Sequence, residues 1–147
     1  MKQLSGALER DEVVFIDTRH NTAVHDGTVA RSLNIPGVAK AASYGAWVYD
    51  PEVEHRPVVL LARDVEEAAA FRDHLVRVGI DTVTGFVTSF DGIDLVTPAL
   101  VAPHGLDRFE HAVLLDVRNK TEYALGHLPG AVQLSAGRRW RWQSATR

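Results

Sequence analysis

The sequence predicts an α/β fold in which helices flank a parallel β-sheet. Residues 13–17 and 57–61 are continuous apolar runs, the first ending in an aspartate, and such runs are typical of strands buried on both faces. Residues 64–78 have apolar side chains at helical spacing and follow the second run. Because strands alternate with helices along the chain, we expect crossover connections of the kind that join parallel strands.

The individual elements follow from local patterns. The predicted strands span residues 13–17, 32–35, 57–61, 82–84 and 112–116, and the predicted helices span residues 4–9, 38–49 and 64–78, with a further short helix through residues 106 and 109. Residues 20–31 are polar and carry Gly27, so we expect a loop there. Residues 38–49 are small and aromatic at helical spacing, and we expect Trp47 to pack inward.

Start and stop signals bound the later elements. A Pro-Gly pair at residues 36–37 ends the second strand. Asp64 is a good N-cap for the clearest helix, Glu67 completes a capping box, and Gly79 provides the C-cap. The proline-flanked segment 97–103 is the expected linker to the rest of the chain.

Composition limits the possible functions. With a net charge of −3 and a pI near 6.1, the chain is not expected to bind nucleic acid. No apolar run reaches the roughly 18 residues that span a bilayer, and no signal-peptide core is present, so we expect a cytoplasmic protein without membrane contact. A protein partner is compatible with this composition, but the sequence does not identify one. Cysteine is absent, which excludes disulfides, thiolate metal sites and a cysteine nucleophile in these 147 residues. The seven histidines are scattered, so we predict no metal site and no cofactor.

The sequence repeats itself at an offset of 99 residues. Residues 14–19 (VFIDTR) are echoed by residues 113–118 (VLLDVR). The register then holds without a gap, so that Gly27 matches Gly126. A repeat of this length is a whole domain, because solenoid units are only about 20–50 residues long.

The repeat therefore predicts the domain organisation. We expect a complete domain at residues 1–97 and the front half of a second domain at residues 98–136. Residues 137–147 form a basic, Trp-containing tail, which we expect to be disordered because so short an aperiodic segment cannot bury a core. The half-domain lacks the later strands of its sheet and would leave an open edge.

Three stretches of the second copy, LDVR (115–118), EY (122–123) and GHLPGA (126–131), resemble the front signature of the rhodanese family. The first copy resembles it more weakly, although its segment 43–51 is similar to rhodanese modules that follow metallo-β-lactamase-like persulfide dioxygenase domains in fusion proteins. The resemblance implies a rhodanese-like fold and these structural signature residues: Asp17, Arg19, Asp116, Arg118, Glu122, Gly126, His127, Pro129 and Gly130.

The resemblance also implies where a reaction would take place. Rhodaneses move sulfane sulfur through a cysteine that ends a central strand and opens a tight loop of inward-pointing amides, which leads into a helix. Counted back from Gly79, the nucleophile position is Ala62. The matching loop is Arg63, Asp64, Val65, Glu66, Glu67 and Ala68. Its carboxylates would repel thiosulfate and cap the amides that should bind it. In the second copy the matching position would lie past residue 147.

Three functional hypotheses remain open. The first is a non-catalytic rhodanese-like module with a structural or regulatory role related to sulfane-sulfur metabolism. The second is a fragment of a sulfurtransferase or persulfide-processing fusion enzyme whose nucleophile lies beyond this chain. The third is an anion-binding module that keeps the pocket without the chemistry. In all three, the pairs Asp17/Arg19 and Asp116/Arg118 are interpreted as structural ties at strand ends.

Overall fold

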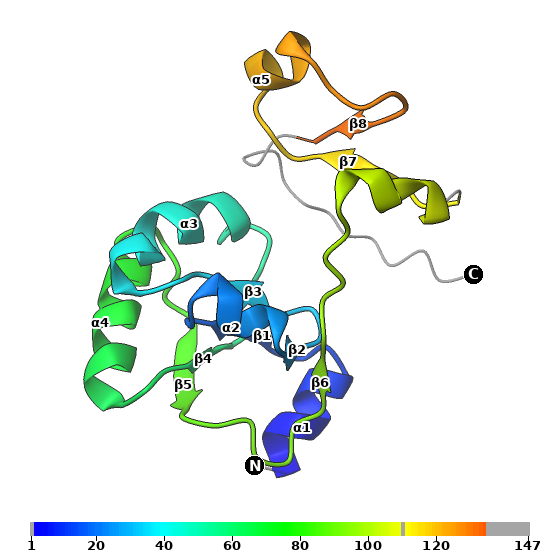
Figure 1. Ribbon diagram of the computed structural model, residues 1–147. Helices are drawn as coiled ribbons and strands as arrows, with labels where there is room; N and C mark the ends of the chain where they lie inside the picture. Colours follow the sequence, from blue (N-terminus) through cyan, green and yellow to red (C-terminus); the bar gives the residue numbers. More distant parts are fainter. Residues whose placement is uncertain (1, 110, 135–147) are drawn as a thin grey trace. The chain divides into compact units, whose positions relative to one another are not determined.

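The computed structural model of the chain describes residues 2–109 and 111–134 (Figure 1). The predicted basic tail at residues 137–147 lies outside the described residues. The chain divides into two units, Met1–Leu100 and Val101–Arg147.

The first unit contains four α-helices and six strands among its described residues. The helices are α1 (Lys2–Glu9), α2 (Asn21–His25), α3 (Ala41–Val48) and α4 (Val65–Val76), with a turn of 3-10 helix, η1 (Val38–Lys40), before α3. The strands are β1 (Val14–Asp17), β2 (Thr28–Val29), β3 (Leu33–Asn34), β4 (Val58–Leu61), β5 (Val83–Val87) and β6 (Leu95–Val96). The predicted α/β class is confirmed.

The main sheet of the first unit has the strand order β3-β1-β4-β5, and every neighbouring pair in it is parallel. Helix α3 forms the crossover from β3 to β4, and α4 forms the crossover from β4 to β5. Strands β2 and β6 form a separate antiparallel pair. The sheet therefore has the topology that alternating strands and helices predict.

Apolar side chains cover both faces of this sheet, as the continuous apolar runs predict. On one face, Ile16 and Leu60 of the sheet pack with Phe71 and Leu75 of α4, and all four are fully buried. On the other face, Phe15 belongs to a smaller apolar cluster, which includes side chains of α1 and of the segment before β6. In Figure 1, α3 and α4 lie on one side of the sheet and α1 lies on the other.

Helix α3 packs closely on α4, and this packing explains why one prediction is wrong. A Cβ on Gly45 would lie 2.8 Å from a methyl group of Leu75, so the small residues of α3 face the core. Trp47 was expected to pack inward, but it is 57% exposed and stacks on Tyr44 with the ring centroids 5.3 Å apart. It lies two residues beyond Gly45, which turns it about 200° away from the packed side of the helix.

Two further predictions are corrected by the first unit. The expected loop at residues 20–31 contains α2, where the His20 side chain accepts a hydrogen bond from the N–H of Thr22, and it also contains β2. The strand expected at residues 82–84 continues through Gly85 to Val87, because β5 pairs with the whole length of β4. Both errors arise where caps or long-range pairing decide the structure.

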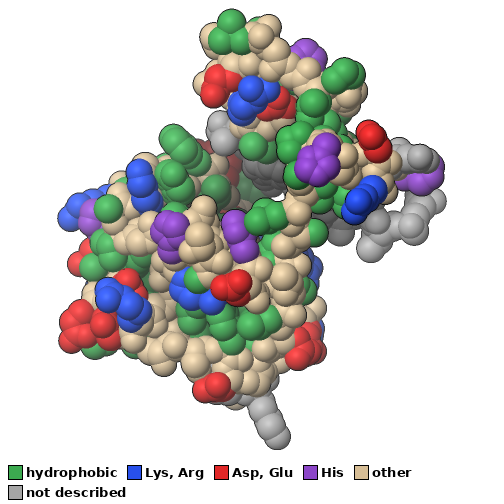
Figure 2. Space-filling model, viewed as in Figure 1, with side chains coloured by type: hydrophobic (Ala, Val, Ile, Leu, Met, Phe, Trp, Pro, Cys, Tyr) green, Lys and Arg blue, Asp and Glu red, His purple; other side chains and the backbone are tan. Residues whose placement is uncertain are grey.

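The second unit repeats the start of the first. It contains the 3-10 helix η2 (Pro103–Phe109), strand β7 (Leu115–Asp116), helix α5 (Lys120–Leu125) and strand β8 (Val132–Gln133), with β7 parallel to β8. Helix α5 is not among the predicted elements, and it begins with a complete capping box formed by Asn119 and Glu122. None of its residues that the structure describes is buried. Figure 2 shows apolar side chains exposed on its surface.

Candidate functional site

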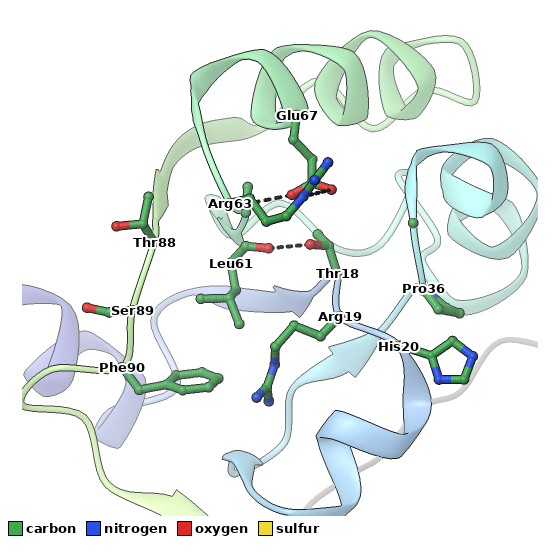
Figure 3. Close-up of a pocket in the computed structure, with 12 residues that line it drawn as sticks. Thr18, Arg19, His20, Pro36, Leu61, Arg63, Glu67, Thr88, Ser89 and Phe90 are labelled. Carbon is green, nitrogen blue, oxygen red and sulfur yellow. Dashed lines mark hydrogen bonds and ion pairs between the residues drawn. The ribbon is translucent and has the colours of Figure 1, made fainter.

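A pocket of about 680 Å³ lies at the carboxyl ends of the parallel strands of the first unit (Figure 3). The segments that follow four strands line it, at residues 18–20 after β1, 36–37 after β3, 62–63 after β4 and 88–90 after β5. In open α/β sheets, ligands bind at this edge. The sequence places the expected reaction centre at the same edge, so this pocket is the candidate site.

Ala62 is the residue to which the resemblance assigns the nucleophile, and it lines this pocket. It follows β4 directly, is 3% exposed, and its N–H donates to the carbonyl oxygen of Val87 at 2.9 Å. The methyl group of alanine offers neither a nucleophile nor a titratable proton. Nothing at this position can carry sulfur.

The connection from β4 to α4 is as short as the predicted N-cap at Asp64 implies. Only residues 62–64 separate the two elements. Residues 65–68 of the loop that the resemblance implies form the first turn of α4, in agreement with the helix predicted over residues 64–78. The cause is the cap itself. Asp64 has extended backbone, and its carboxylate accepts a hydrogen bond from the N–H of Glu67 at 2.8 Å. The helix therefore begins at once and leaves no room for a wider loop.

Glu67 completes this arrangement differently from the predicted capping box. Its carboxylate accepts the N–H of Arg63 at 2.7 Å and the Nε of Arg63 at 3.1 Å, instead of reaching the N–H of Asp64 (Figure 3). Two carboxylates of the chain thus occupy the end of α4 that would otherwise attract an anion. This geometry argues against anion binding at the β4–α4 connection.

Asp17 and Arg19 form an ion pair next to the pocket, which Arg19 lines. The Asp17 carboxylate is fully buried and accepts Arg19 Nε at 3.0 Å, Arg19 Nη2 at 2.7 Å and the hydroxyl of Thr28 at 2.8 Å. Arg19 Nη2 also donates to the carbonyl oxygen of Gly27 at 2.6 Å. The pair therefore joins the end of β1 to the start of β2.

These contacts control the ionisation of Asp17. Burial alone would raise the pKa of its carboxyl group, but the hydrogen bonds from Arg19 and Thr28 outweigh burial and hold the pKa below its usual value. Asp17 is thus a charged group stabilised by its partners. It is held too far inside to receive a proton from a substrate.

Several pocket residues were not predicted from the sequence. The Arg19 guanidinium carbon lies 4.5 Å from the ring centroid of Phe90, and the Thr18 hydroxyl donates to the carbonyl oxygen of Leu61 (Figure 3). Phe90 follows β5 by three residues, so a correct end for that strand would have placed it at the same edge. Thr18 lies between the signature residues Asp17 and Arg19, and this position was the feature of the sequence that could have placed it at the site.

The second copy reproduces the Asp17–Arg19 ion pair in the second unit. Arg118 donates from Nε to Asp116 at 3.0 Å and from Nη2 to the carbonyl oxygen of Gly126 at 2.8 Å, which are the contacts that Arg19 makes with Asp17 and Gly27. The hydrogen bonds from Arg118 lower the pKa of the Asp116 carboxyl group. The structural repeat therefore extends to individual hydrogen bonds.

The other signature residues of the second copy lie along its turn region. Glu122 accepts the N–H of Asn119 at 3.1 Å within the capping box of α5. His127 stacks on Tyr123 with the ring centroids 3.7 Å apart, and its Nδ1 lies 3.0 Å from the Tyr123 carbonyl oxygen. Pro129 and Gly130 belong to the turn before β8, where Gly130 has a φ of 79°. All of these residues order the chain between β7 and β8.

Two further properties concern only the residues that the structure describes. Among them, no three His, Cys, Asp or Glu side chains form a group that could hold a metal ion. No helix in the same part of the chain is long and apolar enough to cross a membrane.

Comparison with solved structures gives modest similarity. A rhodanese-related protein from Thermoplasma volcanium aligns with a TM-score of 0.48 at 15% identity, over 61% of this chain and 89% of that chain. Thiosulfate sulfurtransferase from Pseudomonas aeruginosa aligns with a TM-score of 0.48 at 17% identity, over 92% of this chain and 33% of that chain. A variant of EanB in complex with ergothioneine aligns with a TM-score of 0.44 at 18% identity, over 92% of this chain and 40% of that chain. The chain thus spans a minor part of the last two proteins.

Comparison by sequence gives one family. No curated protein matches the chain. The model of the rhodanese-like domain family matches residues 104–146, a range that contains the signature stretches of the second copy. This match confirms the resemblance predicted from residues 115–131.

Proposed function

We propose that the first unit is a non-catalytic rhodanese-like module with a structural or regulatory role related to sulfane-sulfur metabolism in the cytoplasm. One observation carries the proposal. The strand that would present the nucleophile, β4, is followed directly by Ala62, and the helix that comes next is capped by carboxylates of the chain itself.

The chemistry of sulfur transfer explains why this observation matters. A thiolate must attack the sulfane sulfur of the donor, and the resulting persulfide anion must be stabilised by backbone amides or cations. Ala62 supplies no thiolate. The N–H of Arg63 is already bound to Glu67, and the N–H of Glu67 is already bound to Asp64. The nucleophile is therefore absent at Ala62, and two nearby backbone amides are already bound to carboxylates of the chain.

We expect the purified chain to show no thiosulfate:cyanide sulfurtransferase activity above background. The reason is that none of the 147 residues is a cysteine. The measurement is thiocyanate formation with thiosulfate and cyanide, and heat-denatured protein is the control. Turnover well above that control would refute the proposal, because another group would then be carrying sulfur.

Ala62→Cys alone is not expected to create a sulfurtransferase. The new thiol would be buried in the pocket that Glu67 also lines, and burial and a nearby carboxylate both raise a thiol pKa above the usual value of about 8.5. In the double variant Ala62→Cys/Glu67→Gln, the thiol pKa should fall relative to the single variant, because one negative charge is removed. Thiolate absorbance against pH, together with the activity assay, measures both. A depressed thiol pKa and rapid turnover in Ala62→Cys would show that the connection still works as an anion cradle.

A second candidate is that the chain works as part of a larger sulfurtransferase or persulfide-processing enzyme. The observation that favours it is the family match at residues 104–146, where every signature position is filled. A cysteine-encoding frame directly downstream of the gene, or an upstream metallo-hydrolase domain, would support this candidate over the first.

A further inference from the structure

The charged side chains that line the pocket of the first unit are neutralised within the chain (Figure 3). Arg19 donates from Nε at 3.0 Å and from Nη2 at 2.7 Å to the buried Asp17 carboxylate. Arg63 donates from Nε to the Glu67 carboxylate at 3.1 Å. Because each cation at the pocket has an anion beside it, the lining side chains carry no excess charge that would attract an ion.

Several polar groups at the same surface are also used inside the chain. The N–H of Gly37 donates to the carbonyl oxygen of Thr18 at 3.0 Å, and the Thr18 hydroxyl donates to the carbonyl oxygen of Leu61. The His20 ring accepts the N–H of Thr22 through Nδ1, as a neutral imidazole does. A charged ligand would therefore find few partners here to replace the water that it loses.

Apolar side chains provide the rest of the wall, at Pro36, Leu61, Ala62 and Phe90. Leu61 and Ala62 are buried, so the innermost part of the pocket is apolar. Small-molecule sites are mostly apolar, contain a few polar groups, and measure roughly 300–1,000 Å³. The volume of about 680 Å³ lies within this range. Both the size and the lining of the pocket are thus those of a small-molecule site.

The aromatic wall is held in place by contacts within the chain. The centroid of the Phe90 ring lies 6.3 Å from that of Phe15 and 4.5 Å from the guanidinium carbon of Arg19. The buried residue Ile93 donates its N–H to the carbonyl oxygen of Phe90 at 2.9 Å. A ligand that packs on Phe90 would therefore have little of the protein to order, which favours binding.

We propose that this pocket binds an uncharged, largely apolar small molecule with an aromatic ring, in place of the anion that the family resemblance implies. The proposal rests on the non-catalytic role proposed above and names the class of ligand to which such a module would respond. An uncharged aromatic ligand buries its surface against Leu61, Ala62 and Phe90 and needs no counter-charge. A charged ligand would lose its hydration beside ion pairs that are already complete.

Three small molecules of similar shape test the preference for an uncharged ligand. Cinnamyl alcohol is uncharged, cinnamate is an anion and cinnamylammonium is a cation, and each is titrated into the full-length protein labelled with ¹⁵N. We expect the alcohol to bind saturably, with an affinity at least about tenfold higher than that of either ion, because burial of an unpaired charge is costly. The chemical shifts of the Ala62, Arg63 and Phe90 amides should change, and exchange of the Ile93 amide with solvent should slow.

Protein variants test the location. Phe90→Ala removes the aromatic wall and should lower the affinity for cinnamyl alcohol about tenfold. Phe86→Ala is the matched control, because Phe86 is exposed on β5 and does not line the pocket, and it should bind as the parent does. Ala62→Leu fills part of the pocket and should also weaken binding, whereas Ala69→Leu on the exposed side of α4 should not. The dispersion of the ¹⁵N spectrum shows whether each variant is folded.

The titrations of the parent chain decide the proposal even if a variant fails to fold. Absence of saturable binding of cinnamyl alcohol, or shift changes centred away from the pocket, would overturn it. Cinnamate binding as tightly as the alcohol would make the pocket an anion site and would overturn it too, as would equal losses of affinity in folded Phe90→Ala and Phe86→Ala. Sulfur transfer is assayed separately, so each of these results would leave the non-catalytic role standing.

Discussion

Replacing Asp17 by alanine is expected to lower the free energy of unfolding of the first unit by about 3–5 kcal/mol, the usual cost of breaking a buried ion pair from one side. The carboxylate is fully buried and binds Arg19 and Thr28. Without it, Arg19 keeps only the Gly27 carbonyl oxygen as an acceptor, and the Thr28 hydroxyl loses its buried carboxylate partner. Urea unfolding followed by circular dichroism measures the difference.

The repeat offers a matched control for this variant. Asp116 makes the same contacts with Arg118, but the arginine is exposed and water can replace the carboxylate. Asp116→Ala should therefore leave the urea midpoint of the first unit unchanged. Equal effects of the two substitutions would show that burial does not decide the contribution of Asp17, contrary to our interpretation.

The same pair predicts a pH dependence. The folded-state pKa of Asp17 lies below its usual value of 3.8, so the charged form stabilises the folded unit above that pH. This contribution is lost as the pH falls from about 4 through the folded-state pKa, because the folded carboxylate must then be protonated. The stability difference between the parent and Asp17→Asn should accordingly shrink below about pH 4. A difference that stays constant down to pH 2 would contradict the depressed pKa.

The sequence predicted the parts of the fold that depend on local pattern. Strands β1 and β4 are continuous apolar runs, and α4 has an N-cap and a buried stripe, so each could be recognised without knowing its neighbours. The short helices α2 and α5 were missed, since each has only five or six residues and no apolar stripe, and caps mark where they begin. Strands β2 and β6 were missed because residues far apart in the sequence pair with each other.

The candidate site divides in the same way. The resemblance assigns the nucleophile position to Ala62, and the spacing predicts Asp64 as the N-cap with Glu67 in the first turn of the helix, so the charged helix start is visible in the sequence. The short connection follows as well, because the predicted N-cap at Asp64 is the observed one and α4 begins at Val65. The approach of Arg19 to Phe90 joins the ends of β1 and β5, and no local pattern encodes that distance.

The largest effect that we expect is a difference in cooperative folding between the two units when each is studied as a separate fragment. A fragment of residues 1–100 should fold and unfold cooperatively, because it contains both clusters of buried apolar residues and both partners of the β2–β6 pair. A fragment of residues 101–147 should show no cooperative transition. None of its described residues is buried, and Leu125 is 85% exposed. Apolar burial is the main source of stability, and this unit has too little of it.

Urea unfolding of the two fragments and of the full chain tests this directly, and limited proteolysis of the full chain tests it independently. Residues 97–102 are exposed and lie outside any helix or strand, so elastase should cut there first and leave the first unit intact. This order of cleavage is expected because the backbone is best protected from the protease in β1, β4 and α4, which form the core of the first unit. A cooperatively unfolding fragment 101–147 would contradict this expectation. So would early cleavage within residues 58–76 while the second unit survives, because the core of the first unit would then be the less stable part.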